Sequence, residues 1–282
     1  MNFPETRYTL IQRIATGCDE SAWCEFLGDY WGPICRFAVR RGYLRPDDAE
    51  DVAAQTFLAL VQNRLLARWV LRRSARLRTL LCTVVRQVLA NQGRVRAGGE
   101  RLLREQGGQL RDRPGLPVVA GDEASAEQVD AFYAAWAEDL LQRAVEALLT
   151  DYHREGRGDH FRALYGRLCE GMTAAATAEA LGLTLSQAEN AYKHARARLA
   201  VRLEELVRGH VRRYCPEDEA DGEFRAEWDQ LGEFLTRHGG LEEAVRRTYA
   251  DLGPPRPQAG RASSINATLA ALADLGRASQ GS

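Results

Sequence analysis

The stretch "LGLTLSQAENAYKHARARLAVRLEEL", residues 181–206, predicts two helices joined by a tight turn. Gly182 follows a run of small residues and can adopt the left-handed backbone conformation that ends a helix. Thr184 and Gln187 have the spacing of a capping box, so we expect the second helix to begin at Leu185. Two helices with this turn between them have helix-turn-helix spacing.

The first turns of the expected second helix carry side chains that suit DNA. A recognition helix presents its N-terminal turns to base edges in the major groove, and residues farther along lie nearer the phosphates. An ordinary helical hairpin with a basic outer face is the alternative that these residues leave open. The candidates for base contacts are Ser186, Gln187 and Asn190, and the candidates for backbone contacts are Lys193, His194 and Arg196.

The formal net charge of −1 over 282 residues hides a strong segregation of charge. Residues 60–113 contain thirteen arginines and three acidic residues, and residues 190–213 contain seven basic and two acidic residues. Residues 216–282 carry the opposite excess, with twelve acidic residues and seven arginines. Either basic island alone could be a solvated helix face, but two of them favour a polyanionic partner.

The first basic island includes "SARLRTLLCTVVRQVLANQGRVR", residues 74–96, in which leucines and valines recur at helical spacing and predict a buried stripe. We expect the opposite face to mix guanidinium and amide groups, which can hold phosphates and hydrogen-bond bases. Trp69, just before this segment, is either a stacking platform for an unpaired base or a core anchor. The candidate DNA contacts here are Trp69, Arg78, Arg86, Gln87, Asn91 and Arg94.

A third segment, "RPDDAEDVAAQTFLALVQ" at residues 45–62, predicts a helix that begins at Pro46 with acidic residues in its first turn. Steps of four and three residues place Asp51, Gln55 and Leu58 on one face, away from the apolar stripe around Phe57. A leucine exposed beside polar groups suggests a partner surface. A solvated face with one stray apolar residue is the alternative.

Helical periodicity throughout predicts an all-α protein with two helical domains. We expect a first domain at residues 1–96, a flexible glycine- and proline-rich linker at 97–128, and a second domain at 129–215 that contains the helix-turn-helix. An acidic helical C-terminal extension follows at 216–282, with amphipathic segments at 223–237 and 240–251.

These three segments, in this order, resemble the extracytoplasmic-function class of bacterial RNA polymerase sigma factors. The resemblance covers roughly residues 8–96 and 130–212, and its details are most similar to the long sigma factors of planctomycete-type bacteria. It implies that residues 45–62 bind the polymerase clamp, that the basic helix reads and opens the downstream promoter element, and that the helix-turn-helix reads the upstream element. The implied polymerase-binding residues are Asp48, Asp51, Gln55 and Leu58.

The resemblance implies a protein that binds core RNA polymerase and promoter DNA and directs promoter recognition, DNA melting and transcription initiation. An anti-sigma factor, or the chain's own C-terminal extension, is a candidate regulator, because the extension is opposite in charge to both basic islands. The alternative function is a helix-turn-helix transcription regulator that binds duplex DNA without engaging polymerase.

Enzymatic function is not expected. The five histidines show no metal-ligand spacing, and the sequence contains neither a glycine-rich phosphate loop nor a Gly-x-Ser-x-Gly motif. The six cysteines form no Cys-x-x-Cys pair, so we expect reduced thiols, no metal and no cofactor. Without a signal-like apolar run or a membrane-length apolar stretch, the sequence predicts a cytoplasmic protein that does not insert into membranes.

Overall fold

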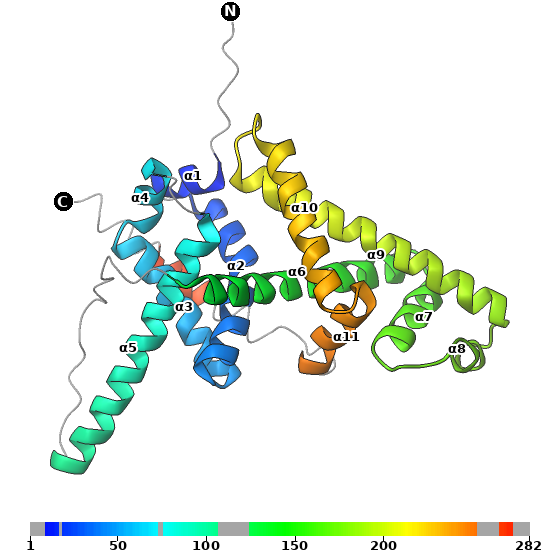
Figure 1. Cartoon of the computed structure of the whole chain (residues 1–282), viewed down its shortest axis with the longest axis horizontal. Helices are drawn as coiled ribbons and strands as arrows, with labels where there is room; N and C mark the ends of the chain where they lie inside the picture. Colours follow the sequence, from blue (N-terminus) through cyan, green and yellow to red (C-terminus); the bar gives the residue numbers. More distant parts are fainter. Residues whose placement is uncertain (1–8, 17–18, 73–75, 107–123, 253–264, 273–282) are drawn as a thin grey trace, which may run out of the picture. The chain divides into compact units, whose positions relative to one another are not determined.

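The structure is a computed structural model that describes residues 9–16, 19–72, 76–106, 124–252 and 265–272 (Figure 1). The described ranges are helical apart from their turns and caps and contain no strand, which confirms the all-α class. The chain divides into two compact units. One comprises Met1–Trp136 with Gln258–Ser282, and the other comprises Ala137–Pro257.

The helices of the first unit pack around α3 and α2. Helix α3 contacts α2, α4 and α5, and α1 contacts α4 and α2. A further helix at residues 265–272 is grouped with this unit. The named helices are α1 (Leu10–Thr16), α2 (Glu20–Gly42), α3 (Pro46–Gln62), α4 (Leu65–Arg72), α5 (Leu77–Gln106) and the beginning of α6 (Ala126–Arg154).

An aromatic cluster fixes how α3 faces the core of the first unit. The Phe57 ring is fully buried, lies parallel to Trp31 at a centroid distance of 6.0 Å and meets Phe26 edge-on at 5.5 Å. The helix begins at Pro46, as expected, because proline has no N–H to lose at the first helical position. With Phe57 directed inward, Asp51, six residues earlier on α3, lies on an exposed side of the helix.

The borders of the units differ from the expected domain borders. Helix α5 continues to Gln106, past the expected end at residue 96, and residues 107–123 of the expected linker lie outside the described residues. The first half of α6, expected at the start of the second domain, buries Phe132 and Trp136 completely within the first unit. Phe132 meets Phe37 of α2 edge-on at 5.5 Å. Apolar burial therefore assigns this segment to the first unit.

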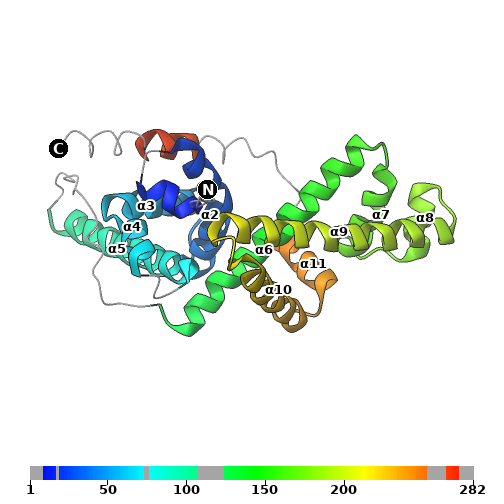
Figure 2. The ribbon, with the colours of Figure 1, turned by 90° about the horizontal axis from the view of Figure 1, so that it is seen from above.

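The second unit is organised along the long helix α9, which contacts α7, α8 and α10 (Figures 1 and 2). Helices α10 and α11 confirm the two amphipathic segments predicted in the acidic extension. Leu231 and Phe234 of α10 are buried, and the Arg208 guanidinium of α9 lies 3.9 Å above the Phe224 ring. The named helices are the rest of α6, α7 (Gly158–Leu168), α8 (Ala174–Leu181), α9 (Leu185–Tyr214), α10 (Ala220–Arg237) and α11 (Leu241–Leu252).

Candidate nucleic-acid interface

The turn between α8 and α9 has the geometry that the sequence predicts. Gly182 ends α8 with φ 65°, in the left-handed region that favours glycine. The Thr184 hydroxyl accepts a hydrogen bond from the Gln187 N–H, and the Gln187 side chain accepts one from the Thr184 N–H at 2.9 Å, which completes a capping box. Helix α9 begins at Leu185, as expected. The two caps fix the direction in which α9 leaves the turn.

The first turns of α9 expose a polar face. Ser186, Asn190 and Lys193 are exposed, whereas Ala188 and Ala195 are buried against the rest of the unit. Steps of four and three residues place the three exposed side chains on one face of the helix. Lys193 makes no ion pair within the part of the chain that the structure describes.

Gln187 is exposed, but its side chain caps the N-terminus of α9. Its Oε1 atom accepts hydrogen bonds from both the backbone N–H and the hydroxyl of Thr184, each at 2.9 Å. A side chain held back against its own helix terminus presents fewer groups outward than Asn190 does. The structure therefore separates two residues that the sequence placed in one role.

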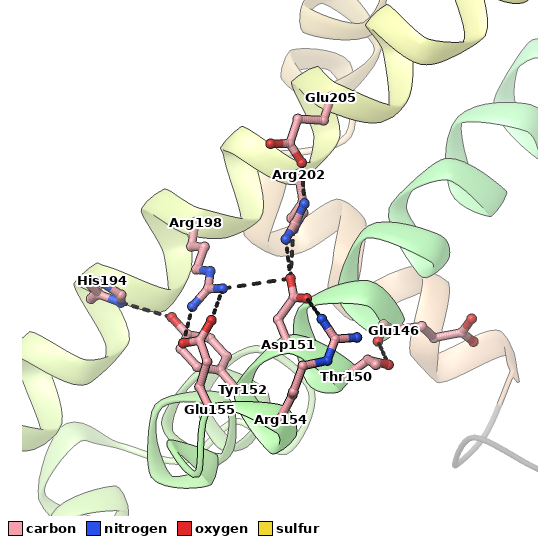
Figure 3. Close-up of polar contacts among 10 residues, drawn as sticks. All are labelled: Glu146, Thr150, Asp151, Tyr152, Arg154, Glu155, His194, Arg198, Arg202 and Glu205. Carbon is pink, nitrogen blue, oxygen red and sulfur yellow. Dashed lines mark hydrogen bonds and ion pairs between the residues drawn. The ribbon is translucent and has the colours of Figure 1, made fainter.

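One edge of this face is bordered by the end of α6. His194 is exposed, and its Nδ1 lies 2.9 Å from the hydroxyl oxygen of the buried Tyr152 (Figure 3). The Tyr152 ring stacks on His160 of α7 at a centroid distance of 5.6 Å. His194 is thus tied to the core of the unit, while Asn190, one turn earlier, projects into solvent.

Farther along α9 than His194, two arginines pair with Asp151 near the end of α6 and with Glu155, which follows α6 (Figure 3). Arg198 donates to both carboxylate oxygens of Glu155, with Nη1 at 2.7 Å from Oε2, and Arg202 donates from Nε to Asp151 at 2.8 Å. The hydrogen bond from Arg198 holds the pKa of Glu155 below its usual range. These charge-assisted contacts join the C-terminal end of α6 to α9.

The other edge of the face is bordered by α11. Glu242 accepts a hydrogen bond from the Tyr192 hydroxyl at 2.6 Å. It also forms an ion pair with Arg196, whose Nε lies 2.8 Å from the carboxylate. Burial, with the hydrogen bond and the charge of Glu242, raises the pKa of Tyr192 to about 12. The Arg167 guanidinium of α7 lies 4.1 Å above the Tyr192 ring. Arg196, expected to contact DNA phosphates, is therefore held by a carboxylate of the acidic extension.

Much of the charge of the second basic island is neutralised inside the unit. Besides Arg196, Arg198 and Arg202, Arg208 pairs with Glu204 on the same helix at 2.9 Å. Since an anionic ligand would compete with these carboxylates, the net charge counted from sequence overstates the attraction of α9 for a polyanion.

The candidate polymerase-binding residues lie along α3 in the first unit. Asp51 is exposed, and Leu58 is half-buried. Asp48 lies 3.5 Å from Nε of Arg45, and Gln55 accepts a hydrogen bond from Nε2 of Gln92 on α5 at 3.3 Å. Helical spacing brings the four candidates to one side of α3, with Gln55 turned toward α5.

The candidate downstream DNA contacts do not form one surface. Gln87, Asn91 and Arg94 share a face of α5, whereas Arg78 lies nine residues before Gln87, which at 3.6 residues per turn is the opposite side of the helix. Arg78 is only 7% exposed, so its expected place on the exposed face is wrong. The remaining candidates are placed as follows: Arg94 is exposed, and Trp69, Arg86, Gln87 and Asn91 are half-buried.

Arg78 is buried against the first half of α6. Its guanidinium carbon lies 4.9 Å from the centroid of the Tyr133 ring and 4.6 Å from that of Trp136. Cation–π contacts of this kind hold a charge in an otherwise apolar surrounding. In this structure Arg78 contributes to the packing of α6 on α5.

Sequence reasoning missed the residues of α6 and α11 that flank α9. Asp151 and Glu155 are four residues apart, as are Arg198 and Arg202, and this matched spacing of acids and bases is a signal that could have paired the helices. Tyr152 and Glu242 carry no comparable signal, because their roles depend on which helix packs beside them.

Comparisons with known proteins gave no match: no family model matches the chain, and no similar curated protein or solved structure was found. Within the described residues, no group of three or more histidine, cysteine, aspartate or glutamate side chains could hold a metal ion. None of the helices in these ranges has the length and apolar character needed to cross a membrane. The described cysteines are free thiols, and Cys18 lies outside the described residues.

Proposed function

We propose that the chain is a transcription protein that recognises duplex DNA with a helix-turn-helix formed by α8 and α9. More particularly, we propose an extracytoplasmic-function sigma factor, which binds core RNA polymerase and directs promoter recognition, DNA melting and transcription initiation. The observation that carries the proposal is the capped turn between these helices, which leaves Ser186, Asn190 and Lys193 exposed on the first turns of α9. These side chains suit base edges and a phosphate.

The first unit supports the polymerase-binding part of the proposal. The exposed Asp51 and half-buried Leu58 lie on a face of α3 that the aromatic core leaves outward. An apolar contact flanked by polar groups is the usual anatomy of a protein interface. The order of the segments along the chain is that of the resemblance: the α3 surface, then the basic helix α5, then the capped pair α8–α9.

A helix-turn-helix regulator that does not engage polymerase is the second candidate. The burial of Arg78 favours it, because one of the proposed downstream DNA contacts lies under α6 rather than on a surface. The exposed polar side chains at the start of α9 fit the sigma factor and the regulator equally well. Binding of core polymerase is the property that separates the two.

The acidic extension is the candidate regulator that the contacts support. Glu242 of α11 pairs with Arg196, which we propose as a phosphate contact, at the edge of the DNA-binding face. DNA phosphates and this carboxylate would therefore compete for the same guanidinium. An anti-sigma partner and a cytoplasmic location remain expectations from sequence.

The proposed function is tested by transcription from a supercoiled plasmid library with core polymerase, with and without this protein, followed by sequencing of the RNA 5′ ends. We expect starts at a specific set of promoters only when the protein is present. Starts that are the same in both reactions would contradict the sigma-factor proposal, and sequence-specific DNA binding without polymerase binding would favour the regulator.

A pair of charge-matched variants tests the polymerase surface by co-purification with core polymerase. Asp51→Arg should reduce co-purification with core polymerase by about tenfold or more, because it places a cation at the centre of the proposed contact. Asp130→Arg makes the same change at an exposed position on α6 and should leave co-purification unchanged. Equal retention of both variants would remove the α3 surface from the proposal.

A further inference from the structure

Tyr152, near the end of α6, makes a hydrogen bond with the exposed histidine of α9. Its hydroxyl oxygen lies 2.9 Å from Nδ1 of His194 (Figure 3). Tyr152 is fully buried, with 0% of its surface exposed, whereas His194 is exposed. A fixed phenol therefore holds one ring nitrogen of a side chain that otherwise faces solvent.

The surroundings of Tyr152 indicate which of the two groups donates. The Arg198 guanidinium carbon lies 4.8 Å from the centroid of the Tyr152 ring. Burial raises the pKa of Tyr152, outweighing the opposing effect of the nearby Arg198 charge, so the hydroxyl keeps its proton at neutral pH. Nδ1 of His194 is the hydrogen-bond partner of this buried hydroxyl within the described residues, and a buried O–H proton needs an acceptor, so the hydroxyl directs its proton toward His194.

A neutral imidazole whose Nδ1 accepts a hydrogen bond carries its proton on Nε2. Within the described residues, Nε2 of His194 makes no hydrogen bond of its own. An N–H donor at this position suits a phosphate oxygen or the N7 and O6 acceptors of guanine. The opposite tautomer would present a lone pair, which these acceptors repel.

We propose that Tyr152 is a positioning residue that keeps His194 in the Nε2–H form, and that His194 thereby donates a hydrogen bond to an acceptor of the bound DNA. The inference rests on the proposed function, because it takes α9 as the DNA-binding helix. It adds a residue of α6 to the determinants of DNA binding, although Tyr152 itself is buried beneath α9.

The first test measures the tautomer in the full-length protein without DNA. Long-range proton–nitrogen spectra of histidine-labelled protein at about pH 8, above the usual histidine pKa of about 6.5, distinguish the two ring nitrogens. The His194→Gln variant identifies the signal by its loss. We expect a protonated Nε2 in the wild type and a mixture of tautomers in Tyr152→Phe, which removes only the hydroxyl.

The second test measures binding of the same proteins, with core polymerase, to promoter duplexes. Tyr152→Phe should weaken binding by about threefold to tenfold, the range of one net hydrogen bond. Tyr165→Phe is the matched control, because the Tyr165 ring packs on Phe161 and Tyr249 in the same unit. Its loss of a hydroxyl should change neither the His194 signal nor the affinity.

A double-mutant cycle separates positioning from folding. In the His194→Gln background, Tyr152→Phe should cause no further loss, whereas an additive loss would show that Tyr152 acts through the fold and would overturn the inference. Duplexes varied at each upstream base pair then identify the acceptor. A loss confined to one base pair indicates a guanine edge, and a uniform loss indicates a phosphate.

The inference and the proposed function fail in different ways. A wild-type His194 that carries its proton on Nδ1 overturns the inference whatever the DNA result. A wild type that binds no promoter DNA and directs no transcription overturns the proposed function and, with it, the DNA-binding role of His194, while the tautomer measurement still reports on the contact with Tyr152.

Discussion

The polar and basic side chains of α9 differ in whether another residue of the chain holds them, although they form one continuous run in the sequence. Asn190 and Lys193 project into solvent, whereas His194 is held by Tyr152 and Arg196 by Glu242. A free amide can adjust to both acceptor and donor of a base edge. A side chain already bonded on one side presents its remaining groups in a fixed direction.

This difference predicts separate effects of Asn190→Ala and Lys193→Ala. Asn190→Ala should relax preference at one or two upstream base pairs, since a good bidentate base contact contributes about 1–3 kcal/mol of discrimination. Lys193→Ala should weaken all sites alike and reduce the slope of log affinity against log salt by about 1. Binding to a randomised upstream element at several salt concentrations measures both. A uniform loss for Asn190→Ala would identify Asn190 as a backbone contact instead.

At the scale of elements, α11 reaches α9, the proposed DNA-binding helix, through the carboxylate of Glu242. Glu242→Gln keeps the size of the side chain and removes its charge, so Arg196 becomes free to pair with a phosphate. The pair is exposed, with 56% and 49% of the two side chains accessible, so we expect only about a twofold to fivefold gain in the affinity of the free protein for promoter duplex at low salt. The gain should shrink at high salt.

The neighbouring glutamate offers the control for this prediction. Glu243 pairs with Arg246 and Arg247 on α11 itself, so Glu243→Gln makes the same change of net charge without touching α9. Its DNA affinity should stay at the wild-type level. If both variants gain equally, the effect comes from net charge alone, and the extension does not act on Arg196.

The packing of α6 on α5 gives a second prediction at this scale. Arg78→Ala removes a guanidinium held between two aromatic rings, together with its alkyl packing, and should lower the free energy of unfolding by about 1–3 kcal/mol. Urea unfolding followed by far-ultraviolet circular dichroism measures the change. Arg94→Ala, at an exposed position on the same helix, should stay within about 0.5 kcal/mol of the wild type.

An unchanged stability of Arg78→Ala, combined with slower promoter opening, would return Arg78 to the role of a DNA contact. The two readouts are independent, because unfolding is measured without DNA. Together they show whether the contact of Arg78 with the first half of α6 contributes to the stability of the first unit.

At the scale of the whole molecule, the segregation of charge along the sequence does not survive folding unchanged. Acidic residues at the end of α6 and on α11 lie beside basic residues of α9 and neutralise them, although they are more than forty positions away in the chain. The Asp151–Arg202 hydrogen bond, for example, joins residues 51 positions apart. The borders of the compact units also differ from those that the glycine- and proline-rich segment of the sequence predicts. Glycine and proline mark where a chain can turn, but buried apolar area decides where a unit ends.

The sequence by itself determined the helices, the start of α3 at Pro46, the capping box at Thr184 and Gln187, and the two helices of the acidic extension. These features depend on contacts within a few residues, which the local order of side chains specifies. Only the tertiary structure decided that Arg78 is buried, that Glu242 holds Arg196 and that Tyr152 holds His194. Each of these contacts joins helices distant in sequence, and the geometry of their packing is not encoded in the periodicity of any one helix.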